Sequence, residues 1–566
     1  MMLQQRAGYF KIVFTIMLFG VALVSVNSFS DYNLLPRLLL LSTTSALFFL
    51  PIRKISLGIE ELLLIGFYLL NISSCFWTDN VSFAMYESQR TFLYFITYFV
   101  GKRILQSYGL LFLSRLIVLM TSTVIFVNGT LFLFYGESLQ SFSTTSAHTN
   151  LLSSFFLLCL PFSLILFFKG QKKWRFLAAI ITLLILLSMV GLGARSVFLG
   201  LLLFALVYII TELKTRGKKQ LYSFIGLMLL VSAGGFALYS IGLIEINTTS
   251  LEERVFIWKK TLLLIADQPM LGVGAGNWIF NYPSYGISGF DTFEIYGLVL
   301  QRPHNDLLWI IAELGIIGFT IISVFWLLFI KVLYGAKKTK ERTILLSSLI
   351  SFLPILLLSF PKERVEHIFL FFILLAVAMN LQGKRVKSLQ LNWFKYPVIL
   401  ISLFSILLLI FNAKGDWYSN KALKAMKNNE PEKVISNNKK ATSFFYSHTI
   451  EGVPLASFTA WAYNQLKDKK KMFLYSHLAY LQAPNNYEIV TNYGMALNSQ
   501  RRFNEAEKIL LRANYINPRY DGCMLNLAVL YYNMGEFEKA KKWIELTYHN
   551  TELSRYYRQL IDQKLN

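Results

Sequence analysis

A cluster of polar and titratable side chains stands at the start of a long apolar run in the middle of the chain. Arg302, His304 and Asn305 precede residues 307–333, which are mostly apolar and carry Glu313. Polar groups at the mouth of a membrane helix usually mark a functional site, because burying them in lipid is costly. A histidine, with an ordinary pKa of about 6.5, can remove a proton from a hydroxyl group. The cluster is therefore a candidate for proton transfer at a membrane surface.

Two arginines are candidate partners of His304. Arg195 lies in the glycine-containing turn of residues 191–200 (GLGARSVFLG), and Arg254 begins an amphipathic stretch within residues 252–278. A guanidinium is planar and permanently charged, so it suits phosphate oxygens. Together the three side chains favour group transfer from a lipid-linked phosphate. A single arginine at a membrane interface is more often an anchor, and a single histidine before a helix is more often a cap. The interpretation as a group-transfer site therefore depends on all three residues lying on the same side of the membrane.

The residues after His304 are expected to begin a helix. Asn305 or Asp306 can cap its N-terminus, and the positive end of the helix then favours the neutral form of His304. Glu313 follows Asp306 by seven residues and so lies on nearly the same helix face. We expect Glu313 to face the bundle interior in an ion pair or hydrogen bond, with Arg302 supporting the charge balance.

Three further polar segments have structural interpretations. Residues 272–277 (GVGAGN) lack the Lys followed by Ser or Thr of a phosphate-binding loop, so a tight turn is expected there. His148 precedes another apolar run and is expected to be a cap, with a donor contact as the alternative. Residues 362–367 (KERVEH) are mostly charged, and we expect mutual pairing to explain them.

The composition predicts a polytopic, all-α membrane bundle. The chain has 566 residues, of which 55% are hydrophobic and 16% aromatic, which is too apolar for an ordinary soluble protein. Three of the apolar runs that could span a bilayer are short, so we expect about 12 to 14 spans. The thirteen runs lie near residues 9–29, 34–51, 57–75, 91–106, 110–135, 150–168, 176–193, 196–212, 221–242, 307–333, 343–360, 367–381 and 396–413.

The formal charge of +23 is explained by topology. With a cytoplasmic N-terminus, alternate loops, such as 169–175 and 337–342, carry the Lys and Arg that the positive-inside rule requires. This orientation places the loop 243–306 and the region from about residue 414 outside the cytoplasm. The basic excess then predicts no nucleic-acid partner, and the N-terminal run is a membrane helix rather than a signal peptide. The three cysteines have no metal or disulfide spacing, so no metal site is expected.

The C-terminal region has a period of 34 residues, which is the tetratricopeptide period. We expect a membrane domain over 1–413, a helical connector over 414–450 and a soluble α-solenoid of tetratricopeptide repeats over 451–566. The solenoid either braces the membrane domain or offers a concave surface to a partner or acceptor. The equivalent pairs are Pro484 and Pro518, Ala479 and Ala513, Gly494 and Ala528, and Ala506 and Ala540.

At these residues the chain resembles the O-antigen ligase family, which includes O-antigen ligases, polysaccharide polymerases and protein O-oligosaccharyltransferases. The resemblance covers about residues 150–380. It is carried by Arg195 in its GARS turn, by Arg254 with Trp258, by the GVGAGNW segment, and above all by residues 304–318 (HNDLLWIIAELGIIG).

The resemblance implies a GT-C-like bundle in the bacterial inner membrane, with the repeat domain in the periplasm. It implies a metal-independent, inverting glycosyltransferase without a cofactor, which moves a glycan from undecaprenyl diphosphate to an acceptor hydroxyl. Arg195 and Arg254 would hold the diphosphate, His304 would act as the base, and Arg302, Asn305 and Glu313 would support the site. The acceptor is lipid A-core, a polysaccharide or a protein. A transporter or scaffold whose tail binds a protein partner is the alternative of a different class.

Overall fold

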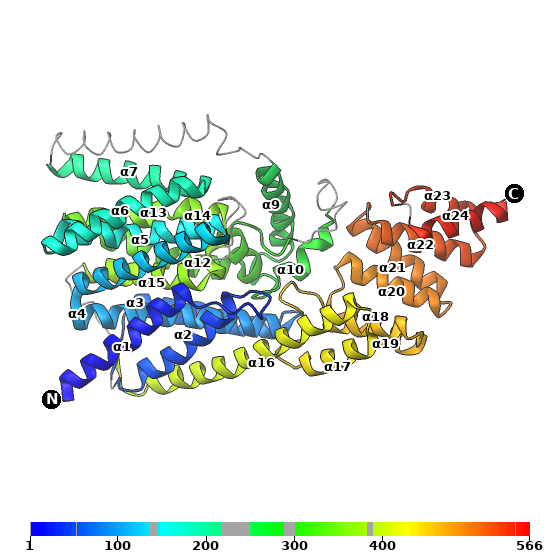
Figure 1. Cartoon of the computed structure of the whole chain (residues 1–566), viewed down its shortest axis with the longest axis horizontal. Coiled ribbons are helices and arrows are strands. Elements are labelled where there is room, and N and C mark those ends of the chain that lie inside the picture. The colour runs from blue at the N-terminus through cyan, green and yellow to red at the C-terminus, as the bar shows by residue number, and fades with distance from the viewer. Residues whose placement is uncertain are drawn as a thin grey trace.

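The computed structural model of the chain describes residues 2–52, 54–135, 145, 148–216, 249–287, 300–381, 389–549 and 551–565. Figure 1 shows a bundle of long helices at the left, a series of shorter helices at the right, and α9 and α10 between them. The bundle contains α1 (Met2–Leu23), α2 (Leu34–Phe49), α3 (Ile59–Ser73), η1 (Ser74–Phe76), α4 (Val81–Tyr135), α5 (Thr149–Lys169), α6 (Lys172–Leu192), α7 (Arg195–Arg216), α12 (Asp306–Gly335), α13 (Lys340–Ser351), α14 (Leu353–Leu358), η3 (Pro361–Glu363), α15 (Val365–Asn380) and α16 (Lys395–Lys427). The segment between the two parts contains α9 (Thr249–Asp267), α10 (Trp278–Asn281) and η2 (Tyr282–Tyr285).

Helices occupy twelve of the thirteen expected apolar runs, and the run at 221–242 lies outside the described residues. Within the described part, 8 helices are long and apolar enough to cross a membrane, and α1, α2 and α15 contain shorter apolar helices. The long helix α4 covers two of the expected runs. Between these runs, Gly109 (φ 79°, ψ 172°) interrupts the helical path. The prediction of an all-α, multi-pass membrane protein is confirmed.

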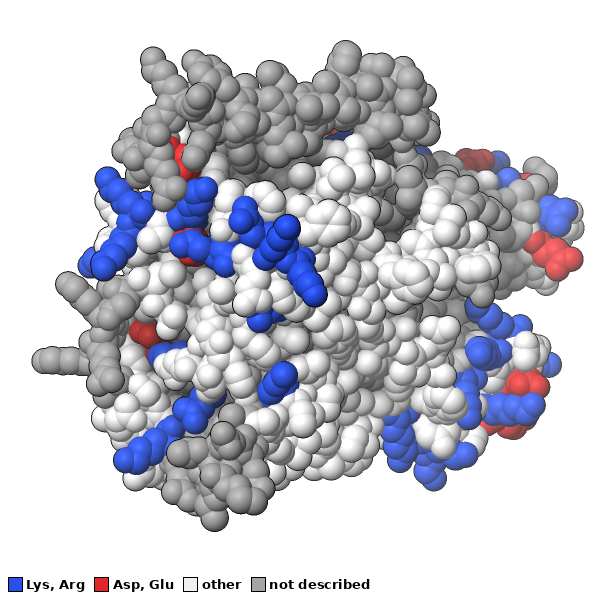
Figure 2. Space-filling view, turned by 60° about the vertical axis from the view of Figure 1, so that its left-hand side comes forward, with Lys and Arg blue, Asp and Glu red and all other residues white. Residues whose placement is uncertain are grey.

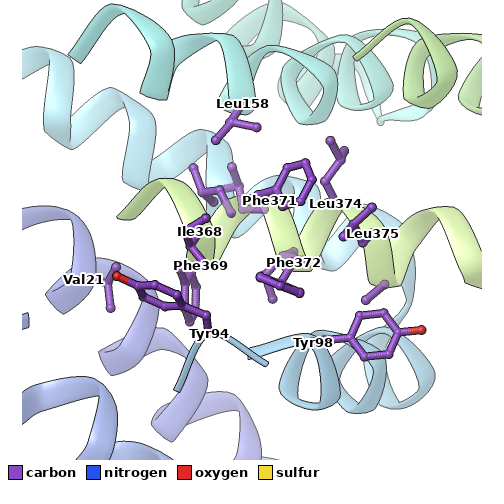
Figure 3. Close-up of a cluster of buried hydrophobic side chains, with 14 of the residues drawn as sticks. Val21, Tyr94, Tyr98, Leu158, Ile368, Phe369, Phe371, Phe372, Leu374 and Leu375 are labelled. Carbon is purple, nitrogen blue, oxygen red and sulfur yellow. The ribbon is translucent and has the colours of Figure 1, made fainter. Parts of the chain in front are cut away.

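Helix α15 forms the centre of the bundle. Every residue from Val365 to Ala378 is buried, as expected for a helix that is apolar on all sides. Figure 3 shows its side chains, including Phe369, among residues of neighbouring helices such as Val21 and Leu158. This packing fixes the start of α15, and with it the η3 turn that precedes it.

The end of the bundle that holds the N-terminus is basic. Figure 2 shows Lys and Arg gathered over this side, with few acidic residues among them. Helix α5 ends there at Lys169, whose ammonium lies 3.0 Å from Oε1 of Glu341 in α13. The short strands β1 (Ile55–Leu57) and β2 (Leu389–Leu391) pair antiparallel and join two connections between helices. This charge distribution is the one that the positive-inside rule gives a cytoplasmic end, and the orientation stays a prediction.

The C-terminal part is a row of helices that continues directly from the bundle. Helix α16 runs without a break across residue 413, where the connector was expected to begin. A buried hydrophobic cluster joins this part to α12 and the segment before it, with Trp278, Tyr282 and Trp309 on one side and Tyr487 and Leu510 on the other. The helices are α17 (Pro431–Ala441), α18 (Leu455–Gln465), α19 (Lys469–Gln482), α20 (Tyr487–Ser499), α21 (Phe503–Ile516), α22 (Asp521–Met534), α23 (Phe537–Glu545) and α24 (Glu552–Leu565).

Candidate functional site

His304 lies in the turn immediately before α12. Its backbone φ is 52°, a left-handed conformation that is uncommon in residues other than glycine. The Asn305 side chain caps the helix by accepting hydrogen bonds from two N–H groups of the first turn, at 3.1 and 3.0 Å. The indole of Trp258 in α9 donates to the carbonyl of Pro303 at 2.8 Å. The turn is therefore held by the cap on one side and by α9 on the other.

Phe360 packs against both His304 and Arg302. The His304 and Phe360 rings meet edge to face with centroids 5.0 Å apart, and the guanidinium carbon of Arg302 lies 4.8 Å from the Phe360 centroid. Arg302 also forms a two-point ion pair with Glu363. Burial alone would raise the pKa of Glu363, but the charges of Arg302 and Arg364 outweigh it and lower the pKa to about 2. Glu363 is therefore ionised at neutral pH and balances the charge of Arg302.

His304 is neutral at neutral pH. Burial, followed by the charges of Arg254 and Arg302, lowers the pKa of His304 to about 4, against the opposing effect of Glu363. A neutral imidazole has a nitrogen lone pair that can accept a proton. The side chain is thus in the protonation state that a base requires, through burial and the two arginines and not through the helix end on which the sequence prediction relied.

Arg254 and Arg195 place two positive charges on the α9 side of His304. Burial lowers the pKa of the Arg254 guanidinium, and the charge of Arg195 lowers it further. Arg195 is the first residue of α7, and the preceding helix ends in a left-handed cap at Gly193 (φ 66°). Because Arg254 also acts on the pKa of His304, the structure brings all three predicted residues into one region. Like charges held near one another favour an anionic ligand.

Lys362 connects the two carboxylates at the start of α12. Its backbone N–H donates to Oδ2 of Asp306 at 2.8 Å, and its ammonium lies 3.1 Å from Oε2 of Glu313. Trp309 donates to the other oxygen of Glu313 at 2.6 Å, and its ring centroid lies 3.7 Å from the same ammonium. The structural interpretation of Glu313 is confirmed. Glu313 therefore holds Trp309 and Lys362 together at the packed face of α12.

Helix α12 is interrupted at Gly315 (φ 63°, ψ −168°), and residues 269–274 fill the interruption. The N–H of Ile316 donates to a carbonyl of this segment at 2.8 Å, and the carbonyls of Ala312 and Glu313 accept from two of its N–H groups at 3.0 and 2.9 Å. Side chains rarely adopt this φ, and a Cβ at Gly315 would collide with the backbone of the segment. The glycine thus lets the loop complete the hydrogen bonds that the broken helix lacks.

A tight turn was expected within residues 272–277, and it lies at the end of that range. There the N–H of Asn277 donates to the carbonyl of Gly274 at 3.1 Å. The Asn277 side chain also accepts from the N–H of Asn80 at 2.9 Å and donates to the Asn80 carbonyl at 3.2 Å. The segment therefore ties α12 to the connection between α3 and α4. His148 is a cap, as predicted, since its Nδ1 accepts from the N–H of Asn150 at 3.2 Å.

The expectation of mutual pairing within residues 362–367 is wrong for most of the segment. Successive residues of η3 and the start of α15 point to different neighbours, so each buried charge meets a partner from another element. Within the segment, Nδ1 of His367 lies 3.6 Å from Oε1 of Glu366. The pairs to other elements are Lys362 with Glu313 and Glu87, Glu363 with Arg302, Arg364 with Asp31, and Glu366 with Arg37. Phe360 and Glu363 are the site residues that the sequence analysis did not identify, and Glu363 could have been sought as a carboxylate partner for Arg302.

Residues 180–323 match the family model described as O-antigen ligase. The matched segment contains Arg195, Arg254 and His304, together with the interrupted helix α12. A comparison with curated proteins found no match. This segment of the multi-pass membrane protein is therefore similar to O-antigen ligases.

Proposed function

We propose that this protein transfers a glycan from undecaprenyl diphosphate to an acceptor hydroxyl at the end of the bundle that carries His304. The observation that carries the proposal is the neutral His304 beside Arg254 and Arg195, all within the segment similar to O-antigen ligases. A lipid-linked donor fits a site built on membrane helices, and its diphosphate fits a pair of guanidinium groups.

In the proposed reaction the acceptor oxygen attacks the anomeric carbon of the donor glycan. The new C–O bond forms as the bond from the anomeric carbon to the diphosphate oxygen breaks, and the diphosphate keeps the electron pair. His304 takes the proton of the acceptor hydroxyl. Attack opposite the leaving group inverts the anomeric configuration. Arg195 and Arg254 offset the charge that develops on the diphosphate, an effect of about 3 kcal/mol for one well-placed donor.

Donor binding would also strengthen His304 as a base. In the structure, the charge of Arg254 helps to keep the pKa of His304 at about 4. A bound diphosphate would offset that positive charge and so raise the pKa towards its ordinary value. His304 would then accept a proton most readily when the donor is in place.

The remaining assignments belong to the same proposal. The basic end of the bundle faces the cytoplasm, so the site and the C-terminal helices face the periplasm. The helices from about residue 451 onward form tetratricopeptide repeats, and residues 414–450 connect them to the membrane domain. Neither a metal nor a cofactor takes part, since the two arginines supply the positive charge. Lipid A-core, a growing polysaccharide and a protein each carry the hydroxyl that the reaction needs.

The direct test replaces His304 with Ala in the full chain and measures glycan transfer from undecaprenyl diphosphate in membranes of a deletion strain. The His304→Ala protein should insert normally and lose transfer by a factor of about 100 to 10,000. His549→Ala is the matched control, because His549 is exposed and pairs with Asp521 in the C-terminal part. Wild-type transfer by the His304→Ala protein would refute the assignment of His304.

A further inference from the structure

A pocket lies where the membrane bundle meets the connector to the C-terminal helices. Its walls come from the α1–α2 connection, the start of α4, the middle of α16 and residues 445–450. All of these segments lie outside the residues that match the O-antigen ligase family model. The pocket therefore lies beside the matched segment, not within it.

The pocket combines aromatic walls with hydrogen-bonding groups. Phe83, Tyr86 and Phe445 supply ring surfaces, and Asp31 and Asp416 supply carboxylates. Aromatic faces pack well against the C–H faces of sugar rings, and carboxylates accept hydrogen bonds from sugar hydroxyls. A pocket with mostly apolar walls and a few placed polar groups is typical of small-ligand sites.

The Asp416 carboxylate is fixed in place and keeps capacity for one further hydrogen bond. Its two oxygens accept from the N–H and the hydroxyl of Ser30, at 2.7 and 2.6 Å, and Tyr446 is a third hydrogen-bond partner. An ionised carboxylate offers about four acceptor positions, so about one remains. A hydrocarbon chain would leave this position unsatisfied, whereas a sugar hydroxyl would use it.

A series of contacts joins the wall of the pocket to the site around His304. Asp31 in the wall forms an ion pair with Arg364 at 2.9 Å, and Arg364 follows Glu363, the partner of Arg302. Arg302 and His304 both contact Phe360. The pocket wall is therefore connected through ion pairs and ring contacts to His304.

The helices that line the pocket and the helices that carry the two arginines lie in different parts of the molecule. Figure 1 shows α7 and α9, which carry Arg195 and Arg254, along the upper part of the molecule, and α2 and α16 along the lower part. An inverting transfer needs the acceptor to approach opposite the leaving group. The position of the pocket thus fits the acceptor better than the donor.

We propose that this pocket binds a sugar residue of a glycan acceptor, through ring packing on Phe445 and Tyr86 and hydrogen bonds to Asp416. The proposal rests on the proposed transferase function and selects a saccharide acceptor over a protein acceptor. It also gives the connector after α16 a direct part in acceptor recognition.

The test measures binding of a lipid-free oligosaccharide, released by mild acid from the host's surface polysaccharide, to the full chain in nanodiscs. Phe445→Ala should weaken binding about tenfold, a loss of about 1.4 kcal/mol. Phe444→Ala is the matched control, because Phe444 is the 68% exposed neighbour and does not line the pocket. Tyr86→Phe, which keeps the ring and removes only the hydroxyl, should reduce binding less than Phe445→Ala, with the thermal unfolding temperature checked for each protein.

Transfer kinetics separate this proposal from the proposed function. Phe445→Ala should raise KM for the oligosaccharide acceptor and leave kcat nearly unchanged, whereas His304→Ala should abolish transfer and still bind the oligosaccharide. Equal binding by the Phe445→Ala and Phe444→Ala proteins would overturn the pocket proposal, as would transfer to a Ser- and Thr-containing peptide with no oligosaccharide binding. Wild-type transfer by the His304→Ala protein would instead overturn the assignment of His304 alone, and absence of glycan transfer by the wild-type protein would overturn the proposed function.

Discussion

The positively charged side chains on the two sides of His304, the η3 side and the α9 side, have different charged neighbours. On the η3 side, Arg302, Lys362 and Arg364 each form an ion pair with a carboxylate. On the α9 side, the charge that acts most strongly on Arg254 is that of another arginine, Arg195. Buried cations in ion pairs hold a structure together, whereas two arginines held near one another favour an anionic ligand. The difference separates the groups that build the site from those that would bind the diphosphate.

The largest effect on stability is expected for Arg302→Ala. Glu363 would then remain buried without its two-point partner, which costs about 3 to 5 kcal/mol of unfolding free energy. Thermal unfolding in detergent should show a clearly lowered transition, and Arg302→Ala with Glu363→Gln should recover part of the loss. An unchanged transition for the single variant would show that the η3 side does not depend on its ion pairs.

Arg254→Ala, unlike Arg302→Ala, should lower glycan transfer and leave stability nearly unchanged. Removing one of two like charges costs little stability, so the unfolding transition should stay close to that of the wild-type protein. Glycan transfer should fall by about 100- to 1,000-fold, because the diphosphate loses a charged donor. Lys259→Ala, at an exposed position of the same helix, is the control. Loss of stability without loss of transfer would reverse the assignment of the two sides.

The pH dependence of stability should also separate Glu363 from His304. The folded pKa of Glu363, about 2, lies below its ordinary value of 4.5, so its contribution is complete above 4.5 and is lost as the pH falls towards 2. The folded pKa of His304, about 4, lies below 6.5, so its contribution is lost between pH 6.5 and 4. His304→Gln should flatten the decline in unfolding temperature between pH 6.5 and 4.5. An equal decline in the variant would contradict the low pKa of His304.

The smallest effect is expected for Asn305→Ala. Loss of a helix cap lowers the free energy of unfolding by about 1 kcal/mol. The two N–H groups at the start of α12 would then form hydrogen bonds with water instead of with Asn305. Transfer should fall only severalfold, since the turn is also held by Trp258. Asn305→Asp should restore most of the stability, because aspartate caps equally well. A loss as large as that of His304→Ala would give Asn305 a direct part in the reaction.

The sequence predicted the features that depend on local pattern. The apolar runs predicted the helices, and residue order predicted a cap at Asn305 or Asp306, of which Asn305 forms it, and the shared direction of Asp306 and Glu313. The partners of residues 362–367 were missed because they come from α2 and the connection before it, from α4, and from α12 and the turn before it, which only the packed bundle brings together. The role of Gly315 was missed for the same reason, since its conformation is explained by residues 269–274. The pocket likewise forms from segments far apart in the chain.

The central claim is that Arg195 and Arg254 bind the donor diphosphate beside His304. It is tested most directly by measuring the affinity of undecaprenyl diphosphate for the His304→Ala protein in nanodiscs, with and without Arg254→Ala. We expect His304→Ala to bind the lipid with nearly wild-type affinity, and the added Arg254→Ala change to weaken binding by a factor of 10 or more, about 1.4 kcal/mol. Equal affinity with and without Arg254 would contradict the account.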